Sequence, residues 1–318
     1  HRIPILSRCL FQNREYVAAR NCPNFNNRIR PARASLRCDN QDLPLPEDQI
    51  STESSEPAND RRPVAYREEA FLQSPESRPL RILSEYLWPL AHFQEEKIQD
   101  TIVFFGSARI EENGPLGRYY QEARELARLL TIWTNAISDS AGGPEPRRRF
   151  VVCSGGGPGI MEAANRGARD AGGKTVGLNI GLPFEQRPNP YITPELSFEF
   201  HYFFMRKFWF AYLAKALVVF PGGFGTLDEM FEILTLMQTE KLAKQIQIIL
   251  YGTEYWDPIL SLEPMADWGA INPADMRLVT RADTPEQAFE YLKAHLTTHH
   301  LVALAEETRA PGIAKTRS

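Results

Sequence analysis

The chain has 318 residues, of which 43% are hydrophobic and 24% are charged, and its formal net charge is −4. This composition is typical of a globular protein and excludes a collagen, a coiled coil and a wholly disordered chain. There is no overall positive field to attract nucleic acid, and no apolar run approaches the roughly 20 residues of a membrane span. We therefore expect neither a nucleic acid nor a membrane as partner.

The two ends of the chain differ from its middle. Residues 1–38 contain eight arginines and a single acidic residue, whereas residues 39–60 contain seven acidic residues and no basic one. Charge blocks without apolar periodicity are typical of disorder, so we expect a disordered extension over 1–62 and a loose tail over 301–318. The arginine-rich head also resembles an organellar transit peptide. We expect a cytoplasmic protein, with organellar targeting left open.

Residues 63–99 form the first segment with a structural pattern. Apolar residues recur at helical spacing between Ile82 and Phe93, which predicts a helical N-terminal cover rather than a catalytic domain. Pro79 suits the start of a helix, while Pro89 should kink or divide it.

Residues 100–300 alternate between short apolar strands and amphipathic helices. Strands are predicted at 101–105, 150–153, 174–179, 216–220, 246–250 and 278–280. Helices are predicted at 116–132, 160–171, 203–213, 227–240 and 284–296, with a polar loop at 134–149. This alternation predicts one Rossmann-like, doubly wound α/β domain, with a parallel sheet covered by helices on both faces.

Three glycine-bearing loops follow predicted strands, at 106–107, 154–159 and 221–226. Ligands of open α/β sheets bind beyond the carboxyl ends of the strands, and the N-terminus of a helix favours a phosphate group. The loops match neither GxxxxGK[ST] nor GxGxxG, so ATP hydrolysis and a dinucleotide are not indicated. They favour a mononucleotide.

The predicted helix at 203–213 has basic residues among aromatic ones. Adjacent residues of a helix point about 100° apart, so Arg206 or Lys207 is expected to face inward. An inward arginine needs a partner because it does not lose its proton.

Glu229 is the best catalytic candidate, and it has two interpretations. Thr226-x-x-Glu229 matches a capping box, which would explain both residues without catalysis. Alternatively, Glu229 is a catalytic carboxylate, with Glu232 on the same helical face. Asp228 is adjacent to Glu229 on the predicted helix, so the two carboxylates point in different directions.

The residues PGGFGTLDE at 221–229, with SGGGPGIM at 154–161 and MRK at 205–207, resemble the LONELY GUY family. The resemblance covers roughly residues 100–297, and its members are cytokinin-activating phosphoribohydrolases that are often labelled lysine decarboxylases. It implies a homodimer that hydrolyses the N-glycosidic bond of a nucleoside 5'-monophosphate, with Arg206 and Glu229 as the catalytic pair. Phe203 stands where family members commonly have methionine.

The loops and the resemblance together give a set of expected substrate-binding residues. They are Gly106, Ser107, Gly155, Gly156, Gly157, Gly159, Met161, Lys207, Gly222, Gly223, Gly225, Thr226 and Glu232. We expect the substrate to be AMP or a cytokinin riboside monophosphate, and we expect no metal and no organic cofactor.

Three other functions compete with hydrolysis. Molybdenum-cofactor carriers resemble the PGGxGT pattern, and a carrier would need the phosphate cradle but not the Arg206–Glu229 pair. A pyridoxal-phosphate decarboxylase is disfavoured because no lysine stands out beside a site for the ring. A metal hydrolase is disfavoured because the six histidines form no HExxH motif, and Cys153, at a strand end, is expected in the core.

Overall fold

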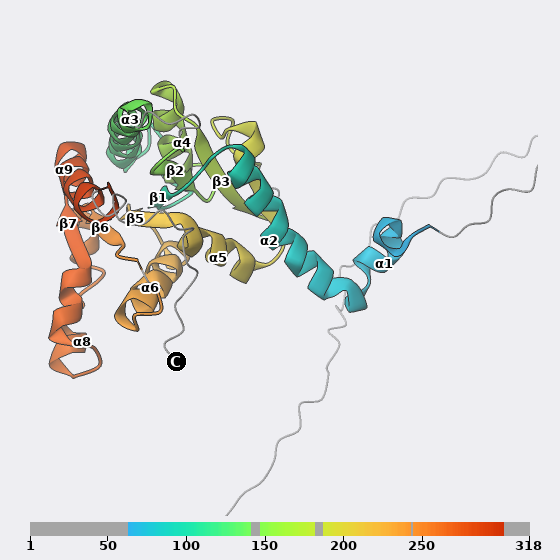
Figure 1. The fold of residues 1–318 in the computed structure, drawn as a ribbon. Coiled ribbons are helices and arrows are strands. Elements are labelled where there is room, and N and C mark those ends of the chain that lie inside the picture. The colour runs from blue at the N-terminus through green and yellow to red at the C-terminus, as the bar shows by residue number, and fades with distance from the viewer. Residues whose placement is uncertain (1–62, 141–146, 182–186, 243, 302–318) are drawn as a thin grey trace, which may run out of the picture. The chain divides into compact units, whose positions relative to one another are not determined.

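The computed structural model describes residues 63–140, 147–181, 187–242 and 244–301. Within these residues a seven-stranded sheet has the order β4-β3-β2-β1-β5-β6-β7, and every neighbouring pair is parallel (Figure 1). Its strands are β1 Thr101–Phe105, β2 Val151–Ser154, β3 Thr175–Ile180, β4 Ser197–Phe200, β5 Ala214–Val219, β6 Gln247–Tyr251 and β7 Val279–Ala282. The predicted Rossmann-like α/β fold is confirmed, and the six predicted strands lie within two residues of observed ones.

Helices cover both faces of the sheet. The longer helices are α2 Arg78–Glu95, α3 Gly117–Ser140, α4 Ile160–Asp170, α5 Phe203–Leu213, α6 Phe224–Gln238 and α9 Pro285–Leu296. Short ones are α1 Glu69–Gln73, α7 Thr253–Trp256 and α8 Glu263–Asp267. There are also 3₁₀ segments at Ala65–Arg67, Pro75–Ser77, Pro194–Leu196 and Pro273–Leu278, and a π-helical segment at Thr297–Leu301. Alternate residues of β1 point to opposite faces, so Ile102 packs with α3, α4 and α9, and Val103 packs with α2, α5 and α6.

The strand order places a topological switch point between β1 and β5. From β1 the chain continues to β2 on one side, and β5 later pairs with the other side of β1. The register sets Phe104 opposite Ser154 and Phe105 opposite Val219, so these three strands end at the same edge. This crevice is where open α/β sheets bind their ligands.

Helix α2 runs through Pro89 without a break, so the predicted division there is wrong. A proline cannot donate to the carbonyl of the residue four positions earlier, here Glu85. Trp209 of α5 supplies the missing donor, because its Nε1 donates to Glu85 O at 2.9 Å. The C-terminal half of α2 lies beside α5 in Figure 1, and Phe93 packs on Trp209 at 5.2 Å between ring centroids.

The polar loop predicted at 134–149 is wrong for its first half, since α3 continues to Ser140. The hydroxyls that made the segment look like a loop bond inside the helix instead. Thr134 Oγ1 donates to Thr131 O at 3.2 Å, and Ser138 Oγ donates to Thr134 O at 3.0 Å. The ring of Trp133 stacks on Phe150 at 5.8 Å, which holds this turn against the sheet. Residues 141–146 lie outside the described residues.

The edge strand β4 and the short helices α7 and α8 were not predicted. In β4, Phe198 and Phe200 are buried and alternate with exposed Ser197 and Glu199, a period-2 pattern of four residues. That run is too short to separate from a loop by periodicity alone.

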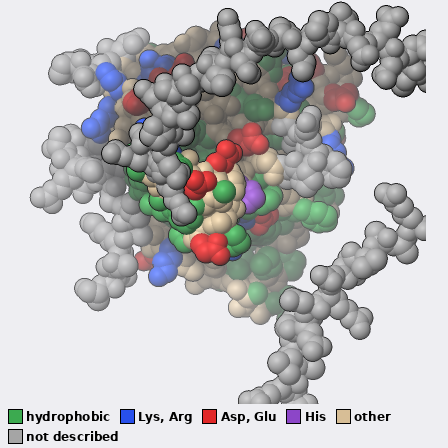
Figure 2. All heavy atoms as spheres, turned by 90° about the vertical axis from the view of Figure 1, so that its right-hand side faces the viewer, with side chains coloured by type: hydrophobic (Ala, Val, Ile, Leu, Met, Phe, Trp, Pro, Cys, Tyr) green, Lys and Arg blue, Asp and Glu red, His purple; other side chains and the backbone are tan. Residues whose placement is uncertain are grey.

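The region before β1 presents apolar side chains to solvent. Figure 2 looks at the side where α1 and α2 lie, and hydrophobic and acidic side chains lie next to each other at its centre. The exposed apolar residues of α2 are Leu80, Leu83, Leu87 and Trp88. The expected extension at 1–62 and nearly all of the expected tail at 301–318 lie outside the described residues, and the domain boundaries at 62, 99 and 300 stay predictions.

Candidate active site

Three loops at the carboxyl edge of β1, β2 and β5 enclose a cavity of about 650 Å³. Its described lining is Phe105, Gly106, Ser107, Ala108, Arg109, Gly155, Met161, Arg206, Gly222, Gly223, Phe224, Gly225, Thr226, Leu227, Glu229, Tyr255 and Ile259. A volume of this size is within the range of small-molecule sites. The loops that the sequence singled out therefore meet at one cavity.

Backbone hydrogen bonds join the three loops to one another. Ser107 N donates to Pro221 O at 2.9 Å, which links the first loop to the third. Ile160 N donates to Ser107 O at 3.2 Å, which links the second loop to the first. The cavity wall is thus one connected hydrogen-bonded unit.

Most of the second loop lies behind the cavity wall and supports the first loop. Gly155 and Met161 line the cavity, whereas the predicted binding residues Gly156, Gly157 and Gly159 are not among the lining residues. Gly159 has φ +71°, a left-handed conformation that favours glycine, and a side chain there would collide with Ser107 O. Its absence of a side chain permits the close contact between the second loop and the first.

The third loop continues directly into α6, which begins three residues earlier than predicted. Gly223 is the N-cap residue, and Leu227 N donates to Gly223 O at 3.1 Å. Thr226 is therefore inside the first turn, where its side chain packs over Gly222. The capping-box interpretation is wrong because neither side chain caps the helix.

Glu229 is paired with Arg206 instead. Arg206 Nη2 donates to Glu229 Oε1 at 2.6 Å, and the two side chains are only 13% and 12% exposed. The guanidinium carbon of Arg206 lies 5.3 Å from the ring centroid of Phe203 and 5.7 Å from that of Phe210. An ion pair so enclosed is only weakly screened by solvent.

The surroundings of Glu229 favour its neutral form. Burial raises the pKa of this carboxyl to about 7, although the positive charges of Arg206 and Lys207 oppose the shift. A carboxyl whose pKa lies near neutrality is able to exchange a proton during a reaction.

Lys207 faces a different side of α5 from Arg206. Its Nζ lies 2.7 Å from Asp228 Oδ2 and 3.0 Å from Glu232 Oε2. Lys207 and Glu232 were both expected to bind substrate, but neither is among the residues that line the cavity. The expectation that one of the two basic residues turns inward holds for Arg206.

Four lining residues lie outside the motifs and elements predicted from the sequence: Ala108, Arg109, Tyr255 and Ile259. Tyr255 Oη donates to Gly222 O at 3.0 Å and so supports the third loop from α7. Phe224 is 93% exposed, which is unusual for an aromatic residue inside a helix. No motif in the sequence pointed to these four residues, except that Arg109 lies three residues after Gly106, the glycine of the first loop.

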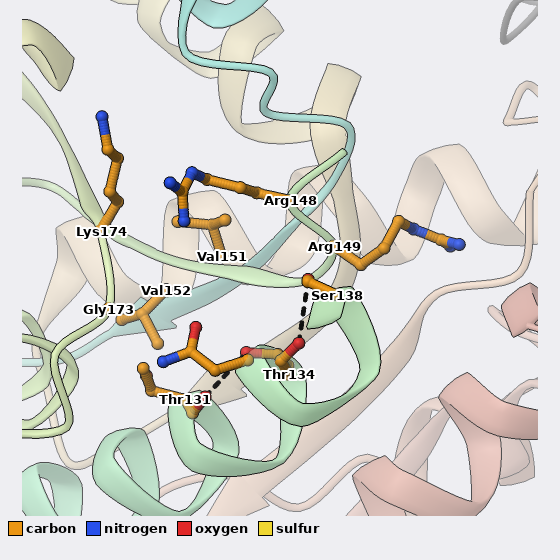
Figure 3. Close-up of a pocket in the computed structure, with 10 residues that line it drawn as sticks. Thr131, Thr134, Ser138, Arg148, Arg149, Val151, Val152, Gly173 and Lys174 are labelled. Carbon is orange, nitrogen blue, oxygen red and sulfur yellow. Dashed lines mark hydrogen bonds between the residues drawn. The ribbon is translucent and has the colours of Figure 1, made fainter. Parts of the chain in front are cut away.

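A second, much smaller cavity lies at the opposite edge of the sheet, near the amino ends of β2 and β3 (Figure 3). Its volume is about 10 Å³, which is room for one water molecule. In Figure 3 the guanidinium groups of Arg148 and Arg149 point in opposite directions. Arg149 Nε binds Asp100 Oδ2 at 2.7 Å, so this arginine has a structural ion pair.

Other candidate chemistry of the described residues is structural. Cys153 is buried, and burial raises the pKa of its thiol, which fits the predicted core position rather than a nucleophile. In the described ranges no group of three or more His, Cys, Asp or Glu side chains could hold a metal ion. The same ranges contain no helix that is long and apolar enough to cross a membrane.

The fold and the site define a Rossmann-like α/β protein whose glycine loops and buried Arg–Glu pair share one cavity. A family model described as "Possible lysine decarboxylase" matches residues 161–292. A cytokinin riboside 5'-monophosphate phosphoribohydrolase of Rhodococcoides fascians is 33% identical over 168 residues, covering 48% of this chain and 83% of the relative. The chain belongs to this phosphoribohydrolase family, the LONELY GUY family that its motifs indicated.

More distant similarities extend over a larger part of the chain. A probable cytokinin riboside 5'-monophosphate phosphoribohydrolase of Oryza sativa subsp. japonica is 25% identical, covering 66% of this chain and 90% of the relative. The solved molybdenum cofactor binding protein of Rippkaea orientalis is 21% identical, covering 62% of this chain and 98% of that one with a TM-score of 0.43.

The description of the family model does not fit the cavity. A decarboxylase that uses pyridoxal phosphate needs a lysine to form the Schiff base. No lysine is among the described residues that line the cavity. The residues present therefore do not suit this cofactor.

Proposed function

We propose that this protein hydrolyses the N-glycosidic bond of a nucleoside 5'-monophosphate, of the AMP or cytokinin riboside type, to the free base and ribose 5-phosphate. The buried Arg206–Glu229 pair, beside a cavity walled by three glycine loops, is the observation on which this proposal rests. The activity for which the relatives in Rhodococcoides fascians and Oryza sativa are named supports it.

The loops suit the phosphate end of such a substrate. The first turn of α6, from Phe224, offers backbone N–H groups that have no partner within the helix, and the helix dipole favours an anion there. Gly223 and Gly225 leave open space around this turn, since a side chain at either position would meet nothing within 4 Å. A phosphate group can therefore approach the backbone closely.

Glu229 suits the sugar end. Cleavage of a ribosidic bond passes through a sugar with oxocarbenium character, which water attacks. A carboxylate next to the sugar stabilises this cation and accepts the proton of the water, while the base leaves with the electron pair of the broken C–N bond and takes up a proton from solvent. Asp228 and Glu232 are turned toward Lys207, so Glu229 is the carboxylate that lines the described part of the cavity.

The remaining lining suits the base. Met161, Tyr255 and Ile259 present apolar or aromatic surface to the same cavity. Such surface binds a flat heterocycle or an apolar substituent by van der Waals contact rather than by hydrogen bonds to the edge of the ring.

The direct test is a panel of nucleoside 5'-monophosphates, with free base and ribose 5-phosphate measured together. Release of the two products in equal amounts from at least one monophosphate is expected. A failure of every monophosphate in the panel to release base would disprove the proposed hydrolysis.

The 5'-phosphate should be required for efficient reaction. We expect a nucleoside without it to react roughly 100-fold more slowly in kcat/KM than its monophosphate, because the loops hold the phosphate through charge-assisted hydrogen bonds. The comparison of AMP with adenosine measures this. Equal kcat/KM values for AMP and adenosine would show that the loops do not bind the phosphate.

The pH dependence should follow Glu229. Because its pKa is raised to about 7 and the ionised form is the active one, turnover should be constant above that pH. Below it, turnover should fall roughly tenfold per pH unit as the carboxylate takes up a proton. A pH profile of kcat with AMP checks this, and a profile that stays flat down to about pH 5 would contradict it.

The homodimer and the cytoplasmic location stay predictions. The exposed apolar residues of α2, Leu80, Leu83, Leu87 and Trp88, offer one surface on which a second copy could pack.

A further inference from the structure

We propose that the guanidinium group of Arg109 binds the 5'-phosphate of the nucleotide, while Arg206 stays paired with Glu229. This inference rests on the proposed hydrolysis and assigns the phosphate to a residue outside the family motifs described above. It follows from the charges around the cavity and from the way the first loop is held.

The charges around the cavity leave Arg109 as the available cation. Arg109 and Arg206 are the basic side chains among the described lining residues. Arg206 is neutralised by Glu229 at 2.6 Å. Lys207, beside the cavity, is neutralised by Asp228 and Glu232.

Arg109 itself has no such partner. Its side chain makes no hydrogen bond or ion pair with any residue that the structure describes, and the residue is exposed. A nucleotide phosphate brings close to two negative charges into the cavity at neutral pH. An arginine of the wall without an anionic partner can offset part of that charge.

Arg206 is poorly placed to take the phosphate instead. Its charge already offsets that of Glu229, to which its Nη2 donates, and a phosphate that drew the guanidinium away would leave the carboxylate buried without a counter-charge. Such a carboxyl takes up a proton, which would remove the ionised form that the reaction needs. A second cation for the phosphate allows binding and reaction to occur together.

The backbone of Arg109 is tied to the third loop, at 221–226, through Ser107. Arg109 N donates to Ser107 Oγ at 3.1 Å, and Ser107 N donates to Pro221 O at 2.9 Å. Arg109 is therefore tied to the residue that precedes Gly222 and the start of α6. A guanidinium presents its N–H groups as a planar fork that matches two phosphate oxygens, so it can complete a site that α6 begins.

The test compares three proteins: wild type, Arg109→Met and Arg109→Lys. The first variant removes the charge and keeps the stem, and the second keeps the charge but loses the fork. We expect Arg109→Met to lower kcat/KM for AMP roughly 10- to 100-fold, mainly through KM, and to leave kcat/KM for adenosine unchanged. Arg109→Lys should fall between. Arg128→Met is the matched control, because Arg128 is an arginine of α3 that pairs with Glu125 and does not line the cavity.

Binding of ribose 5-phosphate, measured by calorimetry, gives a readout that does not need catalysis. Arg109→Met should weaken it by the same roughly 10- to 100-fold. If wild type releases no base from AMP, the proposed hydrolysis fails, and the calorimetric comparison still decides the role of Arg109. An unchanged affinity for ribose 5-phosphate in Arg109→Met, or none in wild type, would overturn the inference about Arg109.

Discussion

Replacing Glu229 with glutamine is expected to lower kcat for AMP roughly 10²- to 10⁴-fold, the usual loss when an acid–base group is removed. The change removes the charge that stabilises the ribosyl cation and the site that accepts the proton of water. It keeps the shape of the side chain, and the amide oxygen of the new side chain can still accept the hydrogen bond from Arg206 Nη2. The fold should therefore survive, which the melting temperature of the variant measures.

Glu232→Gln is the matched control for this experiment. Glu232 lies almost one helical turn further along α6, but its carboxylate pairs with Lys207 and does not line the cavity. Its replacement should change kcat less than about threefold, since a partly exposed ion pair contributes little. Nearly full activity of Glu229→Gln, with unchanged KM, would remove Glu229 from the mechanism and favour a carrier with a phosphate cradle.

Much of the fold and the location of the cavity could be predicted because the signals are local. Apolar runs such as Thr101–Phe105 end at glycines, and this alternation with helices predicts a parallel sheet. The rule that ligands bind at the carboxyl ends of strands then selects the three loops. The observed cavity is lined by residues from all of them, including Gly106, Gly155 and Gly222.

The interpretation of Glu229 as a cap shows where local patterns fail. Thr226 and Glu229 have the spacing of a capping box, but α6 begins at Phe224, ahead of both. The partner of Glu229 is Arg206, 23 residues earlier in the chain, which only the packing of α5 against α6 brings near. A local sequence pattern cannot predict a contact between residues so far apart in the chain, although the family resemblance did pair the two residues.

The same reason explains the errors at Pro89 and in α3. A proline inside a helix leaves a carbonyl without its donor, and the local sequence offers none. The donor is Trp209 Nε1, more than a hundred residues away in the chain. Likewise, Trp133 of α3 stacks on Phe150, and these two residues lie on either side of the segment 134–149 that was predicted to be a loop. Tertiary contacts decide both cases.

Arg206→Met is expected to move the acid limb of the pH profile to higher pH. Burial raises the pKa of Glu229 to about 7. Among the charges that oppose this shift, Arg206 has the largest effect. Without Arg206 burial dominates, so the pKa rises further and Glu229 is protonated at neutral pH. We expect kcat at pH 7 to fall roughly 100-fold and to recover in part as the pH is raised, because the carboxylate then forms.

The stability of this variant should change with pH in the matching direction. A carboxyl whose pKa is higher in the folded than in the unfolded state disfavours folding once it ionises, by about 1.4 kcal/mol per pKa unit. In wild type this loss of stability is complete above about pH 7, whereas in Arg206→Met it should continue to higher pH. Urea denaturation across that range measures the difference.

Lys207→Met is the control that distinguishes the direct ion pair of Arg206 with Glu229 from the effect of any positive charge nearby. Lys207 also lowers the pKa of Glu229, but less than Arg206 does, and it pairs with Asp228 and Glu232 instead. Its replacement should therefore shift the acid limb in the same direction by a smaller amount. If the two variants shifted the limb equally, the direct pair with Arg206 would lower the pKa of Glu229 no more than Lys207 does. If Arg206→Met lost activity to the same extent at every pH, Arg206 would not act by keeping Glu229 ionised. A loss that is independent of pH would instead indicate direct binding of the substrate by Arg206.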